Sequence, residues 1–193
     1  MGSARSAYTL LDSPLGTVGV AWKSSLLLAI RLPLGSAEAT AEALASCAGG
    51  LEPGSPPPEV ADSLARIRRY LAGEVVDLGT LPVDLEGVTA FRRRAYEAAR
   101  ALGRGEVIGY GALAARLGSP GAARAVGGAM ANNPLPIVVP CHRVVGARGA
   151  PGGFSSSRGL EHKAALLALE GYTLELRGHD GAQRSGHAQQ TLL

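Results

Sequence analysis

The amino-acid sequence predicts an α+β protein: an N-terminal α/β domain with a small antiparallel sheet, followed by a C-terminal, mainly helical domain that contains a helix-turn-helix. The 193 residues, 46% of them hydrophobic, are enough for one or two domains with buried cores. Runs of strand-forming residues stand near the N-terminus, whereas helical periodicity prevails after residue 88. We expect domains over residues 1–85 and 86–177, then a disordered tail over 178–193.

The charge of the chain is divided unevenly between the two predicted domains. Residues 1–87 contain 6 Lys or Arg and 10 Asp or Glu, whereas residues 88–177 contain 12 and 5. Such a basic half is typical of a domain that faces a polyanion, but an ordinary solvated surface can have the same composition. Charge alone therefore leaves both interpretations open.

Neither a membrane span nor a secretory signal is predicted. No apolar run approaches the roughly 18 residues that a spanning helix needs, and no basic segment precedes an apolar one at the N-terminus. Cys47 and Cys141 are too few and too far apart to form a disulfide framework. We therefore expect a cytoplasmic protein, associated with the nucleoid if its source is prokaryotic, that does not contact a membrane.

The N-terminal elements are predicted from runs and breaks. Residues 8–11, 17–22 and 26–32 are rich in strand formers and are separated by turn residues, which favours an antiparallel sheet. An Ala-rich helix is expected over 37–47, followed by an irregular loop over 52–58. Leu64, Ile67 and Leu71 form one stripe of a helix over 60–71 that ends before Gly73. Residues 75–84 are expected to be extended.

Three helices are predicted after the domain boundary near residues 85–87. Phe91, Ala95, Ala98 and Leu102 follow helical spacing, with Thr89 as the N-cap. A second helix runs over 110–118, and a third opens at Ser119-Pro120 and ends near residue 131. The last two, joined by a tight turn with a glycine, form the helix-turn-helix.

The third of these helices has an unusual outer face. Val126 lies on its core stripe, and at 100° per residue Arg124 points about 160° away from Val126. Small residues surround this cation, including Gly127 and Gly128, although a glycine inside a helix costs about 1 kcal/mol relative to alanine. Either the helix approaches another surface closely, such as a nucleic-acid groove, or it packs tightly inside the protein.

Cys141 is the candidate nucleophile. A thiol reacts as its thiolate, and a neighbouring base such as His142 lowers its pKa. Residues 137–139 read as an apolar strand, along which adjacent side chains point to opposite faces, so this pair can cooperate only if the chain turns sharply. Pro140 favours such a turn. The alternative is a buried cysteine that acts as a small hydrophobic residue.

A helix predicted over 159–170 supplies a carboxylate. If Leu160 defines its core stripe, His162 faces solvent, while Lys163 and Glu170 border the core on one side. Glu170 can then orient His142, as the third member of an activated nucleophile triad does. Ordinary boundary charges on an amphipathic helix remain the alternative. All four histidines follow residue 141, so no metal site is expected.

These motifs resemble those of the O6-alkylguanine-DNA alkyltransferases. The resemblance rests on the sequences PCHRV at 140–144, RAVGGAM at 124–130, NP at 133–134 and LEG at 169–171. It covers residues 85–175 strongly and 8–84 weakly, through the DSPLG turn at 12–16. The segment GFSSSRG at 153–159 is about two residues longer than its counterpart in the family, which affects the pocket.

The resemblance implies a monomeric repair protein that moves an alkyl group from O6 of guanine, and also from O4 of thymine, to Cys141 in a single turnover without a cofactor. It implies that His142 is a base acting through a water and that Glu170 lies behind it. It further implies an RNase H-like N-terminal domain and binding of double-stranded DNA through the minor groove. Further roles are implied for Tyr110, which hydrogen-bonds the guanine; Asn133, a hinge; Arg124, which fills the space of the everted base; Ser119, Ala125, Gly127 and Gly128, on the DNA-binding surface; and Met130, Val144, Ser155 and Lys163, in the pocket.

Two other functions fit parts of the sequence. A helix-turn-helix regulator without alkyl transfer accounts for the basic half but not for the PCHRV motif. A Cys-His-Glu hydrolase accounts for the nucleophile but not for the helix that carries Arg124.

Overall fold

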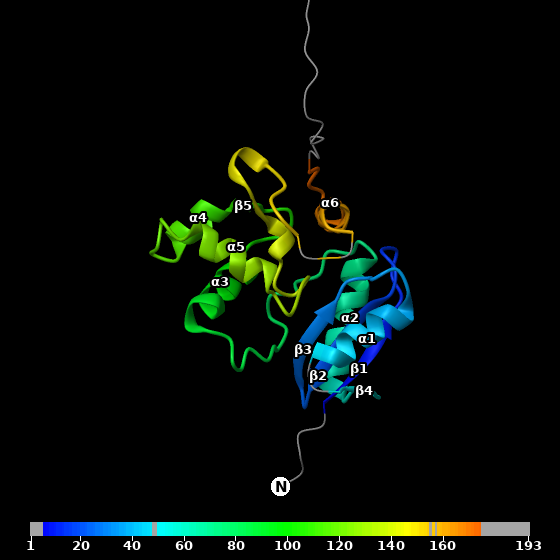
Figure 1. Ribbon diagram of the computed structural model, residues 1–193. Coiled ribbons are helices and arrows are strands. Elements are labelled where there is room, and N and C mark those ends of the chain that lie inside the picture. Colours follow the sequence, from blue (N-terminus) through cyan, green and yellow to red (C-terminus); the bar gives the residue numbers. More distant parts are fainter. Residues whose placement is uncertain (1–5, 48–49, 155, 157, 175–193) are drawn as a thin grey trace, which may run out of the picture.

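The computed structural model describes residues 6–47, 50–154, 156 and 158–174. Two lobes lie side by side, one built on a sheet and one built of helices, and the last helix lies above the junction between them (Figure 1). No helix within the described ranges is long and apolar enough to cross a membrane. The predicted tail and Ser155 lie outside these residues.

The sheet of the N-terminal lobe confirms the predicted antiparallel pairing. Strands β1 (Ser6–Leu11), β2 (Val18–Lys23) and β3 (Leu26–Arg31) pair in the order β3-β2-β1. A short fourth strand, β4 (Glu52–Pro53), pairs with β1 in parallel, so residues 52–58 are not wholly irregular. Proline is tolerated there because β4 is an edge strand, and the amide of Gly54 extends the pairing by donating to the carbonyl of Tyr8.

Two helices cover opposite faces of this sheet. Helix α1 (Ala37–Cys47) places Leu44 against Ala21 on one face. On the other face, Val20 belongs to the cluster that contains the buried stripe of α2 (Pro58–Leu71). Both faces are buried because β2 is apolar at successive positions. The segment 75–84 is not a strand: only Val83 forms an isolated bridge to β3, since Pro82 cannot donate and an Asp77 side-chain turn interrupts the chain.

The helical lobe contains the predicted helix-turn-helix with one shifted boundary. Helix α3 (Ala90–Arg100) is capped by Thr89, and α4 (Tyr110–Arg116) packs against α5 (Ala123–Ala131). Helix α5 begins three residues beyond the predicted start. The amide of Ala122 donates to the carbonyl of Ser119, and this turn places Pro120 at the position where β-turns favour proline.

The segment around the candidate nucleophile is a set of turns. Residues 137–139 do not form the predicted strand, and Ile137 has a φ of 77°. Past Pro140 the chain enters a 3₁₀ helix, η1 (Cys141–Arg143), which is the sharp turn that the sequence required. A short parallel pair, β5 (Ile108–Gly109) and β6 (Val144–Val145), was not predicted; it joins the start of α4 to the residues after η1. Residues 147–149 form η2 (Ala147–Gly149), and α6 (Leu160–Leu169) follows.

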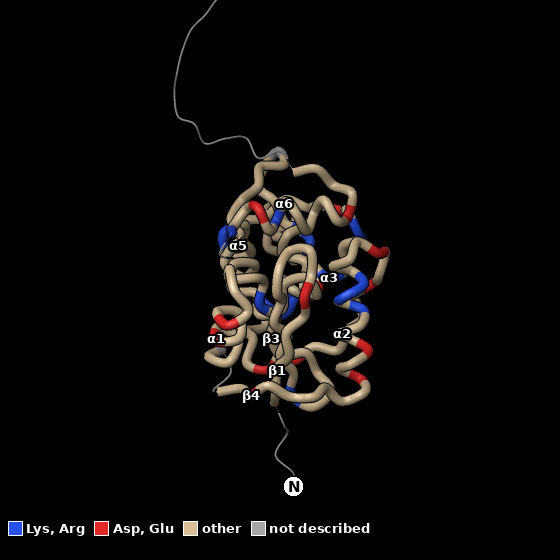
Figure 2. Tube along the Cα trace, turned by 90° about the vertical axis from the view of Figure 1, so that its right-hand side faces the viewer, with Lys and Arg blue, Asp and Glu red and all other residues tan. Residues whose placement is uncertain are grey.

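The acidic and basic residues, which are unevenly distributed along the sequence, are also unevenly distributed between the two lobes. Helix α1 carries Glu38 and Glu42 and no basic residue, whereas α3 carries four arginines and α5 carries Arg124 (Figure 2). The helical lobe therefore carries most of the basic positions, although α2 of the other lobe also carries Arg66, Arg68 and Arg69.

Candidate active site

Cys141 lies at the start of η1, where its side chain is 7% exposed. It lines a pocket of about 970 Å³ together with residues of the helix-turn-helix and of the loop before α6. Tyr110 comes from α4, Arg124 and Met130 from α5, and Phe154 from the loop. One continuous space therefore connects the sulfur to the exposed face of α5.

His142 is completely buried beside Cys141. Its Nε2 lies 3.0 Å from Oε1 of Glu170, while its Nδ1 has no hydrogen-bond partner among the described residues. Because a carboxylate can only accept, Nε2 carries the proton and Nδ1 presents a lone pair. Burial lowers the pKa of His142, and Arg143 and Lys163 lower it further against the opposing effect of Glu170. The imidazole is therefore neutral at neutral pH.

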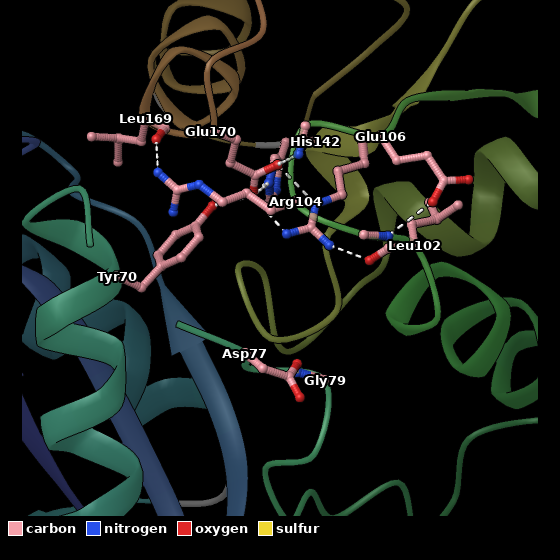
Figure 3. Close-up of polar contacts among 12 residues, drawn as sticks. Tyr70, Asp77, Gly79, Leu102, Arg104, Glu106, His142, Leu169 and Glu170 are labelled. Atoms are coloured by element: carbon pink, nitrogen blue, oxygen red, sulfur yellow. Dashed lines mark hydrogen bonds and ion pairs between the residues drawn. The ribbon is translucent and has the colours of Figure 1, made fainter. Parts of the chain in front are cut away.

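Glu170 follows the last turn of α6 and accepts hydrogen bonds from several segments of the chain (Figure 3). Besides His142, it accepts from Arg143 through Nε at 2.9 Å and Nη2 at 2.8 Å, from the amide of Gly105 at 3.0 Å, and from the hydroxyl of Tyr70 at 2.6 Å. Burial alone would raise the pKa of this carboxyl, but these contacts hold it well below its usual range. Glu170 is thus a fixed negative charge behind His142.

The thiol of Cys141 is protonated in the resting protein. Burial raises its pKa, while a hydrogen bond from Asn133 and the positive charge of Lys163 act in the opposite direction. A neutral thiol beside a neutral imidazole can pass its proton to that ring when the sulfur reacts. Burial also lowers the pKa of Lys163 to about 8, and its Nζ donates to the carbonyl of Val144 at 2.7 Å. Neither Lys163 nor Val144 lines the pocket.

Asn133 ties the end of α5 to the loop before the nucleophile. Its Nδ2 donates to the carbonyl of Val139 at 2.8 Å, and its Oδ1 accepts from the amide of Leu135 at 3.0 Å. The segment that it joins to α5 is a loop rather than the strand predicted from the sequence. Asn133 therefore links the end of α5 to the segment that carries Cys141.

Tyr110 forms part of the pocket wall at the start of α4. Its hydroxyl donates to the carbonyl of Gly153 at 3.4 Å, and burial raises its pKa. Gly152 has a φ of +66°, and a Cβ there would lie 2.9 Å from the Tyr110 ring. The loop before α6 can approach Tyr110 only because residue 152 is a glycine.

The outer face of α5 is bare. Arg124, Ala125 and Gly128 are exposed, and a Cβ at either Gly127 or Gly128 would meet no atom within 4 Å. Tight packing inside the protein, one of the two explanations that the sequence left open, is therefore wrong for this pair. Ser119 is half-buried in the turn that precedes the helix.

The prediction that His162 faces solvent is wrong. Its side chain is 2% exposed, and Nδ1 lies 3.0 Å from the hydroxyl of Ser156. The segment before α6 returns over this face of the helix, which helical periodicity alone cannot indicate. No group of three or more metal-ligating side chains occurs among the residues that the structure describes.

Two residues of the site were not singled out from the sequence. Arg143 belongs to the PCHRV motif, so its place next to His142 was a usable signal. Tyr70 stands on α2 of the other lobe, and its spacing indicated only a core position. Its contact with Glu170 joins residues 100 positions apart in the chain.

The fold and the site together define a protein that joins a helix-turn-helix to a cysteine nucleophile backed by a His–Glu pair. The family model for the DNA-binding domain of 6-O-methylguanine DNA methyltransferase matches residues 90–172. A methylated-DNA–protein-cysteine methyltransferase from Mycolicibacterium paratuberculosis is 39% identical over 84% of this chain and 91% of its own length. Another, from Methanothermobacter thermautotrophicus, is 34% identical over 86% and 85%.

Solved structures agree with these relatives. The Mycobacterium tuberculosis OGT in complex with DNA is 34% identical, with a TM-score of 0.69 over 86% of this chain and 93% of that one. The O6-methylguanine-DNA methyltransferase of Pyrococcus kodakaraensis gives a TM-score of 0.64 at 30% identity, over 86% and 99%. This chain belongs to the methylated-DNA–protein-cysteine methyltransferases, and both the family resemblance and the α+β class predicted from the sequence are confirmed.

Proposed function

We propose that this protein repairs double-stranded DNA by moving an alkyl group from O6 of guanine to the sulfur of Cys141. The observation that carries this proposal is the pocket, which Cys141 shares with Tyr110 and Arg124 of the helix-turn-helix. The same chemistry extends to O4 of thymine, because both lesions place an alkyl carbon on an oxygen conjugated with the base.

The reaction begins with the thiol proton. The buried Nδ1 of His142 takes this proton through a water, and Glu170 stabilises the imidazolium that forms. The sulfur attacks the alkyl carbon, the new C–S bond forms, and the C–O6 bond gives its electron pair to the guanine ring. Tyr110 donates a hydrogen bond to the departing base, and the His142 imidazolium returns its proton through water to that base, so the proton lost by the thiol ends on guanine. A thioether is not hydrolysed by water, so the protein acts once.

The lesion must leave the base stack before it can reach Cys141. Extruding a nucleotide costs a few kcal/mol, and a side chain that fills the vacated space offsets part of this cost. Arg124 is exposed on α5 and lines the same pocket as Cys141, so it suits this role. Ser119, Ala125, Gly127 and Gly128 provide the close approach of the helix to the minor groove, where sequence readout is poor.

Met130 and Phe154 form apolar parts of the pocket wall around the alkyl group. Val144 and Lys163 support this wall through their contact with each other, and Asn133 holds the nucleophile loop against α5. The exposed Arg92 and Arg94 of α3 supply positive charge for the phosphates, so DNA affinity falls with salt. We infer that the protein acts as a monomer in the cytoplasm.

The decisive experiment is to incubate the protein with duplex DNA that contains O6-methylguanine and to measure its mass. We expect a gain of one methyl group per protein molecule on Cys141. Cys141→Ala should show no gain, whereas Cys47→Ala, which removes the other cysteine, should gain the methyl group as the wild type does. Repeated turnover of an ester would support the hydrolase, and DNA binding without a mass change would support the regulator.

A further inference from the structure

Tyr70 reaches the active site from the other lobe. It stands in the last turn of α2 with a side chain that is 1% exposed. Its hydroxyl oxygen lies 2.6 Å from Oε1 of Glu170 and 3.3 Å from Nε2 of His142. Figure 3 shows the ring of Tyr70 extending from the N-terminal lobe toward Glu170. The hydroxyl therefore touches both members of the His–Glu pair.

The proton positions in this cluster follow from the donors present. Nε2 of His142 donates to Oε1, so the Tyr70 hydroxyl directs its only proton to the same oxygen. Burial and the adjacent charge of Glu170 raise the pKa of Tyr70, which keeps the hydroxyl protonated. Oε1 thus accepts from Tyr70, His142 and Arg143, while Oε2 accepts from Arg143 and Gly105. Tyr70 is the one donor of this set that the N-terminal lobe supplies.

A second contact holds the two lobes together at this point. The guanidinium of Arg104 donates to the carbonyls of Gly73 at 3.0 Å and Glu74 at 2.7 Å, just beyond α2. The same group donates to the carbonyl of Leu169, at the end of α6. Arg104 therefore joins the end of the helix that carries Tyr70 to the residue before Glu170.

We propose that Tyr70 is a positioning residue for alkyl transfer, through which the N-terminal lobe orients His142 and limits its basicity. The proposal rests on the roles proposed above for His142 and Glu170. A carboxylate oxygen that already accepts a short hydrogen bond attracts the imidazole proton less strongly. The Tyr70 hydroxyl therefore keeps the lone pair on Nδ1 available at a lower pH than the His–Glu pair alone would allow.

Tyr70→Phe tests this role because it removes the hydroxyl and keeps the ring. We expect the acid limb of the single-turnover rate against pH to move upward by about 0.5–1 pH unit, since Glu170 then stabilises the imidazolium more strongly. Affinity for duplex DNA should not change. Tyr96→Phe is the matched control: it removes another buried hydroxyl, which donates to the carbonyls of Ala129 and Asn132 and not to the His–Glu pair, and should leave the pH midpoint in place.

Nuclear magnetic resonance separates this proposal from the proposed function. The titration of His142 in unreacted protein needs no DNA, and it should move to higher pH in Tyr70→Phe even if Cys141 accepted no alkyl group. Arg104→Gln leaves Tyr70 intact but loosens the junction, so it should shift the same titration in the same direction by a smaller amount. An unchanged His142 titration in Tyr70→Phe would overturn the role of Tyr70, whatever Arg104→Gln and the mass measurement show.

Discussion

Nε2 of His142 lies 3.0 Å from Oε1 of Glu170, and neither side chain is exposed to solvent. Burial excludes water from the bond between them, so the carboxylate interacts only with the imidazole and with the other protein donors fixed around it. Tyr70 and Arg143 are two of these donors. The proton that leaves Cys141 therefore enters a network whose charges are already in place.

Glu170→Gln should slow alkyl transfer by about 10²-fold, because an amide cannot stabilise the imidazolium as a carboxylate does. Burst rates with methylated duplex DNA would measure this effect, and DNA affinity should stay near that of the wild type. The variant also leaves Arg143 without its charged partner, so we expect a loss of a few kcal/mol in the free energy of unfolding. An unchanged rate would remove Glu170 from the mechanism.

Lowering the pH should reduce the free energy of unfolding over a defined pH range. The pKa of His142 in the folded protein lies below its ordinary value of 6.5, so below that pH the unfolded chain binds more protons than the folded one. Stability is therefore complete above about 6.5 and is lost as the pH falls toward the folded pKa. Glu170 extends the loss below 4.5, because its pKa is lowered too.

Thermal unfolding between pH 8 and pH 5 measures this loss. His142→Gln should flatten the dependence without abolishing it, since burial also lowers the pKa of His162. The same slope in the variant and the wild type would show that His142 is not the group responsible.

Arg124→Ala should separate base extrusion from chemistry. We expect the reaction with a lesion in duplex DNA to slow by about 10- to 100-fold, in line with the few kcal/mol that unstacking costs. Reaction with free O6-benzylguanine should change little, because no base has to leave a helix. Arg68→Ala removes an equal charge from the exposed face of α2, in the other lobe, and serves as the control that should keep the wild-type rate with both substrates. Equal losses with both substrates would contradict the role of Arg124.

Gly152→Ala should disturb Tyr110. The new Cβ would lie 2.9 Å from the phenol ring in a backbone conformation with a φ of +66°, so either the loop or the ring must move. We expect transfer to slow by about 10-fold, an estimate based on the loss of one positioned hydrogen bond. Gly87→Ala imposes similar backbone strain, with a φ of +75° and no atom within 4 Å, and should leave the rate unchanged.

The sequence predicted the parts of this protein that depend on local patterns. Strand runs, the cap at Thr89 and the position of Arg124 all follow from spacing, and the requirement for a sharp turn after Pro140 follows from the opposite directions of neighbouring side chains in a strand. What spacing could not supply was the tertiary context. His162 is buried by a loop that precedes its own helix, and Tyr70 meets Glu170 across the two lobes.

Replacing the exposed Gly128 of α5 should change stability and DNA binding in opposite directions. Alanine in place of Gly128 should stabilise the helix by about 0.5–1 kcal/mol, because it reduces the backbone freedom of the unfolded chain and its Cβ meets no atom within 4 Å. If this face approaches the DNA backbone closely, the same methyl group should weaken duplex affinity, while reaction with free O6-benzylguanine continues at the wild-type rate. Thermal unfolding and a DNA titration at fixed salt measure the two effects. A stabilised variant with unaltered affinity would mean that Gly128 does not lie against the duplex.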